Sequence, residues 1–166
     1  MLLEGRHPAA TLDGLDLFAA SLEGAYCATV VCAIFDREDA VVTYARAGHP
    51  PPLVVNAAGT MWLEHGGAPL AVTNRQIRKN ATVQLSGDDV IILYSDGLIE
   101  RRGETLDDGF DRLACAATEL FGSAVQPFAD GLIKRLLPEH ATDDVVLVVK
   151  KLTIIGPPSD RHLTAI

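Results

Sequence analysis

Acidic side chains stand at the ends of the two most apolar segments of the chain. Residues 90–94 (VIILY) run through Ser95 into Asp96, and Asp143 and Asp144 directly precede residues 145–149 (VVLVV). If these segments are neighbouring antiparallel strands, the end of one adjoins the start of the other, and the carboxylates converge. Like charges so close together cannot all stay ionised without a neutralising partner. A divalent cation is the simplest partner, and oxygen ligands without nearby cysteine or histidine favour Mg²⁺ or Mn²⁺.

A purely structural role for these aspartates is the alternative. Asp-Gly after a strand is an ordinary turn dipeptide, and aspartates often begin or cap elements because they accept hydrogen bonds from backbone N–H groups. The spacing alone leaves both interpretations open. A turn or helix-start role is expected for six other aspartates, because their neighbours are turn or helix-start residues: Asp36, Asp39, Asp88, Asp89, Asp107 and Asp108.

His49 stands in a distinctive loop. Gly48 precedes it and three prolines follow it, so the backbone is free just before the histidine and pinned in an extended form after it. Such a loop either presents the imidazole for proton transfer or phosphate contact, or is braced by the hydrogen bonds of the histidine. The chain contains no Gly-x-Ser-x-Gly nucleophile elbow, P-loop or dinucleotide fingerprint.

Apolar periodicity predicts the elements that position these residues. Spacings of three and four predict a helix near residues 9–22, and strand-like runs on either side of short turns, the first rich in β-branched residues, predict hairpins at 28–35 with 40–47 and at 53–56 with 60–63. Residues 90–94 are apolar on both faces, which is typical of a central strand. Further elements are a strand at 82–85, a helix with its apolar face over 110–121, a helix at 125–136 with Ser123 as N-cap, and a strand at 145–152. This order predicts an α+β fold with helices packed on antiparallel sheet.

Length and composition narrow the class of protein. The chain has 166 residues, enough for about one domain of roughly 150 residues. Its net charge of −8 argues against nucleic-acid binding over a general surface and against binding to an anionic membrane. No apolar run approaches the roughly 20 residues of a membrane span, and no secretory signal pattern is present, so we expect a cytoplasmic protein. The three cysteines lack zinc-site spacing and are expected to be reduced core thiols.

Four sequence blocks, in this order, resemble the SpoIIE-type branch of the metal-dependent Ser/Thr protein phosphatases, the PPM or type 2C-like family. The resemblance covers about residues 11–151, and the Tyr-Ser-Asp-Gly and Asp-Asp motifs are its specific part. The blocks are residues 44–55 (YARAGHPPPLVV), 67–72 (GAPLAV), 85–100 (LSGDDVIILYSDGLIE) and 142–148 (TDDVVLV).

The resemblance implies a four-layer α-β-β-α sandwich, with two Mn²⁺ or Mg²⁺ ions at one end. It implies hydrolysis of phosphoserine or phosphothreonine by metal-activated water, on a bacterial signalling protein such as an anti-sigma-factor antagonist. Asp96 and Asp143 match metal ligands of the family and Asp144 is the adjacent position, whereas His49 matches a motif residue without a defined role. We expect one partial phosphatase domain over residues 1–153 and a flexible tail over 154–166.

One family block has no counterpart in this sequence. The family carries a bridging aspartate in an N-terminal Gly-Asp-x-x-Gly-x-Gly motif, and the present sequence begins with the helix that lies after it. The chain is therefore expected to lack the N-terminal part of the domain. The alternative function is therefore a catalytically inactive binding or regulatory module. A sheet edge left uncovered by the missing part would also favour self-association.

Overall fold

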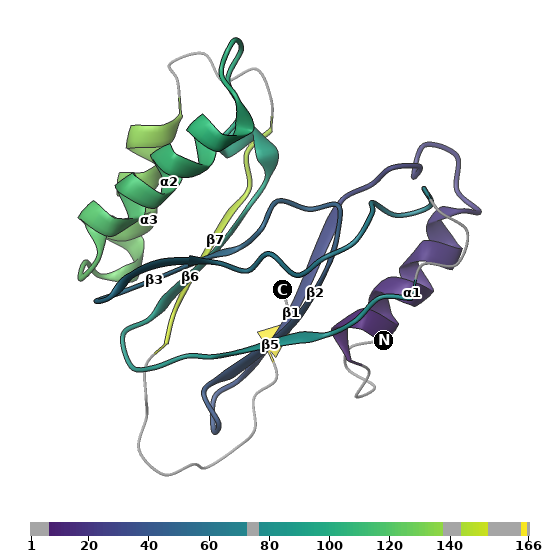
Figure 1. Ribbon diagram of the computed structural model, residues 1–166, viewed down its shortest axis with the longest axis horizontal. Helices are drawn as coiled ribbons and strands as arrows, with labels where there is room; N and C mark the ends of the chain where they lie inside the picture. The colour runs from purple at the N-terminus through teal and green to yellow at the C-terminus, as the bar shows by residue number, and fades with distance from the viewer. Residues whose placement is uncertain (1–6, 73–76, 138–143, 153–163, 166) are drawn as a thin grey trace. The chain divides into compact units, whose positions relative to one another are not determined.

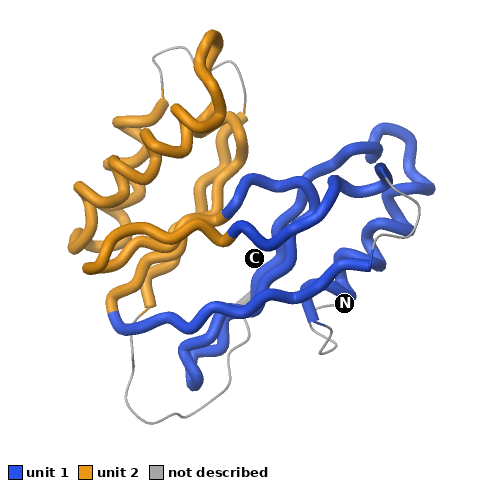
Figure 2. Tube along the Cα trace, in the orientation of Figure 1, with its two compact units in different colours: residues 1–51, 64–87, 154–166 blue, residues 52–63, 88–153 orange. Residues whose placement is uncertain are grey.

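The computed structural model describes residues 7–72, 77–137, 144–152 and 164–165, and the chain divides into two compact units. Unit 1 comprises residues 1–51, 64–87 and 154–166, and unit 2 comprises residues 52–63 and 88–153 (Figure 2). Each unit contains a four-stranded antiparallel sheet and its own helical cover (Figure 1). The predicted combination of antiparallel sheets with packed helices is confirmed.

The sheet of unit 1 is built around a hairpin. The strand order is β5-β2-β1-β8, and β1 pairs with β2 from Val30 opposite Ala47 to Asp36 opposite Val41, as predicted. In the turn, Asp36 Oδ1 accepts hydrogen bonds from the N–H groups of Glu38, at 3.0 Å, and Asp39, at 3.2 Å, so Asp36 has the expected turn role. The elements are α1 (Pro8–Ala19), β1 (Val30–Asp36), β2 (Val41–Ala47), β5 (Ala81–Gln84) and β8 (Thr164–Ala165).

Helix α1 covers one face of this sheet and is shorter than predicted. Pro8 occupies its first turn, where a missing N–H costs nothing. The helix ends at Ala19. Beyond it the backbone bonds join residues three apart, from Ser21 N to Phe18 O and from Leu22 N to Ala19 O, as in a turn. Phe18 and Leu22 belong to the apolar spacing of three and four that predicts this helix, but they are 59% and 46% exposed, so the spacing was wrong as a sign of burial at these two residues. The buried cluster on this face consists of Ala9, Leu12, Ala19, Cys32, Ala45, Ala47 and Leu70.

The sheet of unit 2 has the order β4-β3-β6-β7, and all five residues of β6 are buried. Ile92 and Tyr94 pack with α2 and α3, whereas Ile91 and Leu93 alternate onto the other face and are buried as well. Burial of both faces confirms β6 as a central strand. The elements are β3 (Leu53–Asn56), β4 (Gly59–Trp62), β6 (Val90–Tyr94), the 3₁₀ turn η2 (Asp96–Leu98), α2 (Leu106–Leu120), α3 (Val125–Leu136) and β7 (Leu147–Lys151).

The two helices of unit 2 begin differently. At the start of α2, Asp108 Oδ2 accepts hydrogen bonds from Thr105 Oγ1, at 2.7 Å, and Thr105 N, at 2.9 Å, while Thr105 Oγ1 accepts one from Asp108 N. These bonds hold the pKa of Asp108 below its ordinary value. The predicted Ser123 cap of α3 was wrong: the N-cap is Ala124, which makes no side-chain cap bond.

Three further expectations concern the cysteines, a membrane span and the C-terminus. All three cysteines are free thiols, but only Cys32 is buried, whereas Cys27 and Cys115 are exposed. Within the described ranges, no helix combines the length and apolarity that crossing a bilayer requires. The predicted tail over 154–166 stays a prediction, because only residues 164–165 of it are described.

Candidate functional site

Pairing of β6 with β7 brings two of the acidic motifs together within unit 2. The strands are antiparallel, with Tyr94 opposite Leu147. Beyond this pair, Ser95 N donates to Val146 O at 2.9 Å, and Ser95 Oγ accepts from Val146 N at 2.9 Å. Ser95 Oγ also lies 3.2 Å from the carbonyl oxygen of Asp144, to which it donates. The backbone of Asp144, the second residue of the Asp-Asp motif, therefore lies directly beside Ser95, where the Asp-Gly turn starts.

Asp96 begins a tight turn that is anchored in the core. Its carbonyl oxygen accepts hydrogen bonds from Ile99 N, at 2.8 Å, and Glu100 N, at 2.9 Å, and its Oδ1 accepts one from Gly97 N at 3.0 Å. The carboxylate side chain is exposed, whereas Leu98 and Ile99 are each only 1% exposed. The turn thus presents a surface carboxylate on a backbone that the apolar core holds in place.

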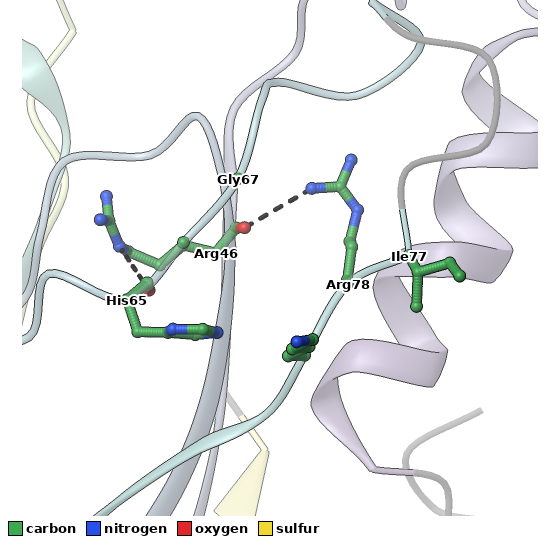
Figure 3. Close-up of a pocket in the computed structure, with 7 residues that line it drawn as sticks. Arg46, His65, Gly67, Ile77 and Arg78 are labelled. Atoms are coloured by element: carbon green, nitrogen blue, oxygen red, sulfur yellow. Dashed lines mark hydrogen bonds between the residues drawn. The ribbon is translucent and has the colours of Figure 1, made fainter.

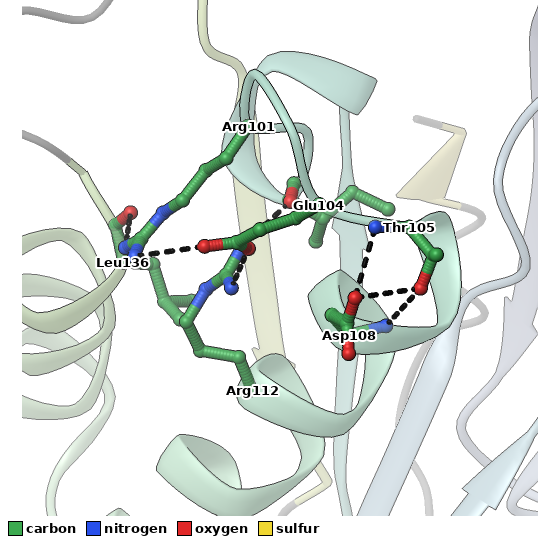
Figure 4. Close-up of polar contacts among 7 residues, drawn as sticks. Arg101, Glu104, Thr105, Asp108, Arg112 and Leu136 are labelled. Carbon is green, nitrogen blue, oxygen red and sulfur yellow. Dashed lines mark hydrogen bonds and ion pairs between the residues drawn. The ribbon is translucent and has the colours of Figure 1, made fainter.

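Helix α2 braces the far end of this turn. The Ile99 carbonyl accepts a hydrogen bond from Arg112 Nη2 at 2.8 Å, and a Cβ on Gly109 would lie 2.5 Å from the same oxygen. Arg112 also pairs with Glu104, and Arg101 donates to the Leu136 carbonyl at the end of α3 (Figure 4). Sequence inspection did not single out these arginines, because their partners include backbone carbonyls 13 and 35 residues away.

Asp96 and Asp144 are exposed residues at one end of the β6-β7 pair. Their carboxylate oxygens are the kind of ligand that a hard divalent cation prefers. Asp143 lies outside the described residues. In the part of the chain that is described, no three or more His, Cys, Asp or Glu side chains form a group that could hold a metal. The metal-ligand roles of Asp96, Asp143 and Asp144 stay predictions.

His49 lies in unit 1, in a loop locked by backbone contacts. Its Nδ1 is 2.8 Å from the Pro50 carbonyl oxygen, and its own carbonyl accepts a hydrogen bond from the Arg46 guanidinium. Gly48 N donates to Gly67 O at 2.7 Å, and Gly67 N donates to Arg46 O at 3.1 Å. These contacts are of the loop-bracing kind, and a chemical role for His49 stays a prediction.

A buried ion pair, which sequence inspection missed, holds α1 to the rest of unit 1. Arg78 Nη2 lies 3.1 Å from Asp16 Oδ2, and their side chains are 2% and 16% exposed. Asp16 Oδ1 accepts a further hydrogen bond from Ala71 N at 2.8 Å, and Arg78 Nη1 donates to Ala68 O at 3.0 Å. The pair therefore ties the helix to residues 67–72 and to Arg78, which follows them.

Comparison with solved structures finds the same fold in bacterial phosphatase domains. The RsbU and RsbW domains of Rv1364c from Mycobacterium tuberculosis match 93% of the chain with 28% identity and a TM-score of 0.83, and the chain spans only 44% of that structure's length. The SiaA-PP2C domain of Pseudomonas aeruginosa matches 88% of the chain with 18% identity and a TM-score of 0.68, over 61% of its own length.

A third match is the phosphatase domain of SpoIIE from Bacillus subtilis, presoaked with Mn. It matches 93% of the chain with 16% identity and a TM-score of 0.59, over 71% of its own length. At the sequence level, the family described as stage II sporulation protein E (SpoIIE) matches residues 1–153. The chain therefore belongs to the SpoIIE family and has the fold of PP2C-type phosphatase domains.

Proposed function

We propose that this chain contributes the metal-binding part of a cytoplasmic protein serine/threonine phosphatase, which acts on a phosphorylated bacterial signalling protein. Membership of the SpoIIE family supports a phosphatase of this type. The observation that carries the proposal is the hydrogen bonding of Ser95 to Asp144 and Val146, because it joins the Asp-Gly turn to the Asp-Asp block.

Asp96, Asp143 and Asp144 are the proposed ligands of Mn²⁺ or Mg²⁺. Carboxylate oxygens suit these hard cations, and the Bacillus subtilis SpoIIE domain was presoaked with Mn. When bound, the ions supply Lewis-acid activation of water and offset the charge that develops on the phosphoryl oxygens. This chain's own task is positioning: Ser95 keeps the two motifs in register, and Arg112 holds the turn that carries Asp96.

The proposed substrate is a phosphoserine or phosphothreonine protein such as an anti-sigma-factor antagonist. The Mycobacterium tuberculosis structure joins an RsbU domain to an RsbW domain in one protein, which supports a place for this chain in a similar regulatory system. The shared fold alone does not select the protein that carries the phosphate. Self-association through a sheet edge remains part of the proposal, and the outer strands of the described sheet in unit 2 are β4 and β7.

Manganese binding and phosphopeptide hydrolysis test the function together. We expect Mn²⁺ to bind the wild-type chain in titration calorimetry, and Asp96→Asn to weaken binding at least about tenfold, since even residues behind metal ligands affect affinity by that factor. Asp111→Asn is the matched control, because Asp111 is an exposed aspartate on α2 of the same unit. It should leave binding unchanged.

Hydrolysis of a phosphoserine peptide is measured with the same variants, both on this chain and on a longer protein that adds the family's N-terminal block. Activity that requires Mn²⁺ and falls with Asp96→Asn but not with Asp111→Asn supports the proposal. Absence of Mn²⁺ binding together with inactivity in both proteins would overturn it. In that case the chain is a binding module that keeps the phosphatase fold.

A further inference from the structure

A small basic pocket lies within unit 1 (Figure 3). Its volume is about 120 Å³, and none of the proposed metal ligands contributes to it. Three cationic side chains surround it although the chain as a whole carries a net charge of −8. The lining residues are Arg46, His65, Gly66, Gly67, Ile77, Arg78 and Lys79.

Arg78 supplies a fixed positive charge at the pocket wall. Its side chain is only 2% exposed, and its guanidinium is held by Asp16 Oδ2 at 3.1 Å and by the Ala68 carbonyl at 3.0 Å. A third, longer contact of 3.5 Å reaches the Arg46 carbonyl, as Figure 3 shows. Acceptors on three different segments hold the guanidinium, so its positive charge stays at a fixed position in the pocket wall.

Arg46 forms the opposite part of the wall and is equally constrained. Its Nε donates to the His65 carbonyl at 3.2 Å, and its terminal nitrogens donate to the carbonyls of His49 and Glu64. The guanidinium packs directly over Gly66, where an added Cβ would lie 2.9 Å from the Arg46 Cζ atom. The wall is therefore built before any ligand arrives, and binding would not have to order these side chains.

Lys79 and His65 complete the pocket with adaptable side chains. Both residues are exposed. Among the described residues, no hydrogen bond or ion pair holds the Lys79 ammonium or the His65 ring. Lys79 therefore offers three ammonium donors to an incoming group, and His65 offers a ring nitrogen.

We propose that this pocket binds a phosphoryl group, either free inorganic phosphate or the phosphate of a phosphoserine side chain. Two carboxylates, Asp16 on the Arg78 guanidinium and Asp13 at 3.4 Å from the Arg78 backbone N, offset part of the charge of the three cations, and a phosphoryl group would offset the remainder. A volume of about 120 Å³ is well above the roughly 10–15 Å³ that a single water molecule needs, so a tetrahedral group with four oxygens has room to enter. A concave surface lined by one sign of charge also concentrates the field on such a ligand.

Titration of the full chain followed by ¹H–¹⁵N NMR tests the pocket. The buffer is kept metal-free, so that the outcome does not depend on the proposed metal centre. The probes are inorganic phosphate, a phosphoserine peptide and the same peptide with unmodified serine. We expect resonance shifts at Gly66, Gly67 and Lys79 with both phosphorylated probes, and none with the serine peptide.

Two Lys→Gln variants, one in the pocket and one outside it, test whether the binding belongs to this pocket. Lys79→Gln should weaken phosphate binding about fivefold, the factor for one charge pair at about 4 Å in a water-like dielectric. Lys134→Gln removes an exposed lysine from α3 in unit 2 and should change nothing. Both variants alter an exposed side chain, so neither is expected to impair folding.

The outcomes separate the two sources of phosphate and can refute the site. Tighter binding of the phosphoserine peptide than of inorganic phosphate assigns the pocket to a phosphorylated protein, whereas equal binding assigns it to free phosphate. Absence of shifts at Gly66 and Gly67 with either probe would overturn the proposal, and so would equal weakening by Lys79→Gln and Lys134→Gln. The metal-free titration reports on the pocket and the Mn²⁺-dependent hydrolysis reports on the proposed function. Failure of one therefore leaves the other standing.

Discussion

Replacement of Gly48 by alanine tests whether the loop that carries His49 is held by backbone fit. Gly48 has a positive φ of +66°, a conformation that L-residues rarely adopt. An added Cβ would also approach the ring of Pro69: it would clash with Cγ and lie 2.9 Å from Cα and Cβ. The substitution therefore carries two separate costs, one conformational and one steric.

The magnitude follows from these two terms. The left-handed conformation costs an alanine about 1–2 kcal/mol relative to glycine. The overlap with Pro69 adds about 1–3 kcal/mol, the usual cost of overpacking, because the proline ring and its backbone cannot swing aside like a flexible side chain. Gly48→Ala should therefore lower the free energy of unfolding by about 2–5 kcal/mol.

Gly24→Ala is the matched control in the same unit. Gly24 has a φ of +84°, and an added Cβ would meet nothing within 4 Å, so this variant carries the conformational cost alone. Urea unfolding followed by circular dichroism gives both values, provided that the m-values agree with that of the wild type. Equal destabilisation by the two variants would refute the steric part of the reasoning.

A double-mutant cycle with Pro69→Ala sharpens the test further. Removal of the proline ring eliminates the nearest contact, with Cγ, whereas the contacts with Cα and Cβ remain. The double variant should therefore be less destabilised than the sum of the two single variants, with a coupling energy of at least about 0.5 kcal/mol. Strict additivity would indicate that the two residues do not compete for the same space.

Three further predictions concern polar contacts. Arg78→Met should lower the free energy of unfolding by about 3–5 kcal/mol in urea titrations, because it leaves the largely buried Asp16 carboxylate without its partner. Arg112→Met removes the donor to the Ile99 carbonyl and should weaken Mn²⁺ binding in calorimetry, whereas unchanged affinity would deny this arginine a positioning role. The pKa of Asp108 is lowered in the folded state, so its stabilisation is present above the ordinary aspartate pKa and is lost as the pH falls through the folded-state value. The difference in unfolding free energy between wild type and Asp108→Asn should accordingly shrink on acidification.

The strands could be predicted from the sequence because their signals are local. Residues 30–36 and 41–47 are rich in β-branched and other apolar residues on either side of a turn rich in aspartate, and they form the expected hairpin. Residues 90–94 are apolar throughout and form a strand buried on both faces. In both cases the residue types within the segment itself indicate a strand, so no knowledge of distant segments is needed.

Helix ends were predicted less well because they depend on what the neighbouring chain does. Ser123 has the side chain of a good N-cap, but its N–H donates to the Leu120 carbonyl, and Gly122 adopts a φ of +93°. The serine therefore belongs to the tight connection that ends α2, and α3 begins one residue later than its side chain suggested. A residue that suits two roles cannot be assigned from its type alone.

The arginine contacts lay beyond sequence inspection for a different reason. Arg46 donates to the backbone carbonyls of His49, Glu64 and His65, and Arg112 donates to that of Ile99; every residue possesses such a carbonyl, so no residue type marks the acceptor. Arg78 and Asp16 are 62 residues apart and share no periodic pattern. The proximity of the Asp-Gly turn to the Asp144 backbone was accessible only because antiparallel pairing of two apolar strands could be assumed.

The four motif blocks form two pairs, and the two pairs exist for different physical reasons. In unit 1, Gly67 O accepts a hydrogen bond from Gly48 N, Gly67 N donates one to Arg46 O, and the approach of Pro69 leaves no room for a side chain on Gly48. In unit 2, the Asp-Gly and Asp-Asp blocks meet through Ser95, whose bonds leave the side chain of Asp96 exposed. The first pair constrains the backbone and the second presents carboxylates. Loss of the first pair should therefore appear in folding stability before activity, whereas loss of the exposed Asp96 carboxylate should appear in metal binding with little change in stability.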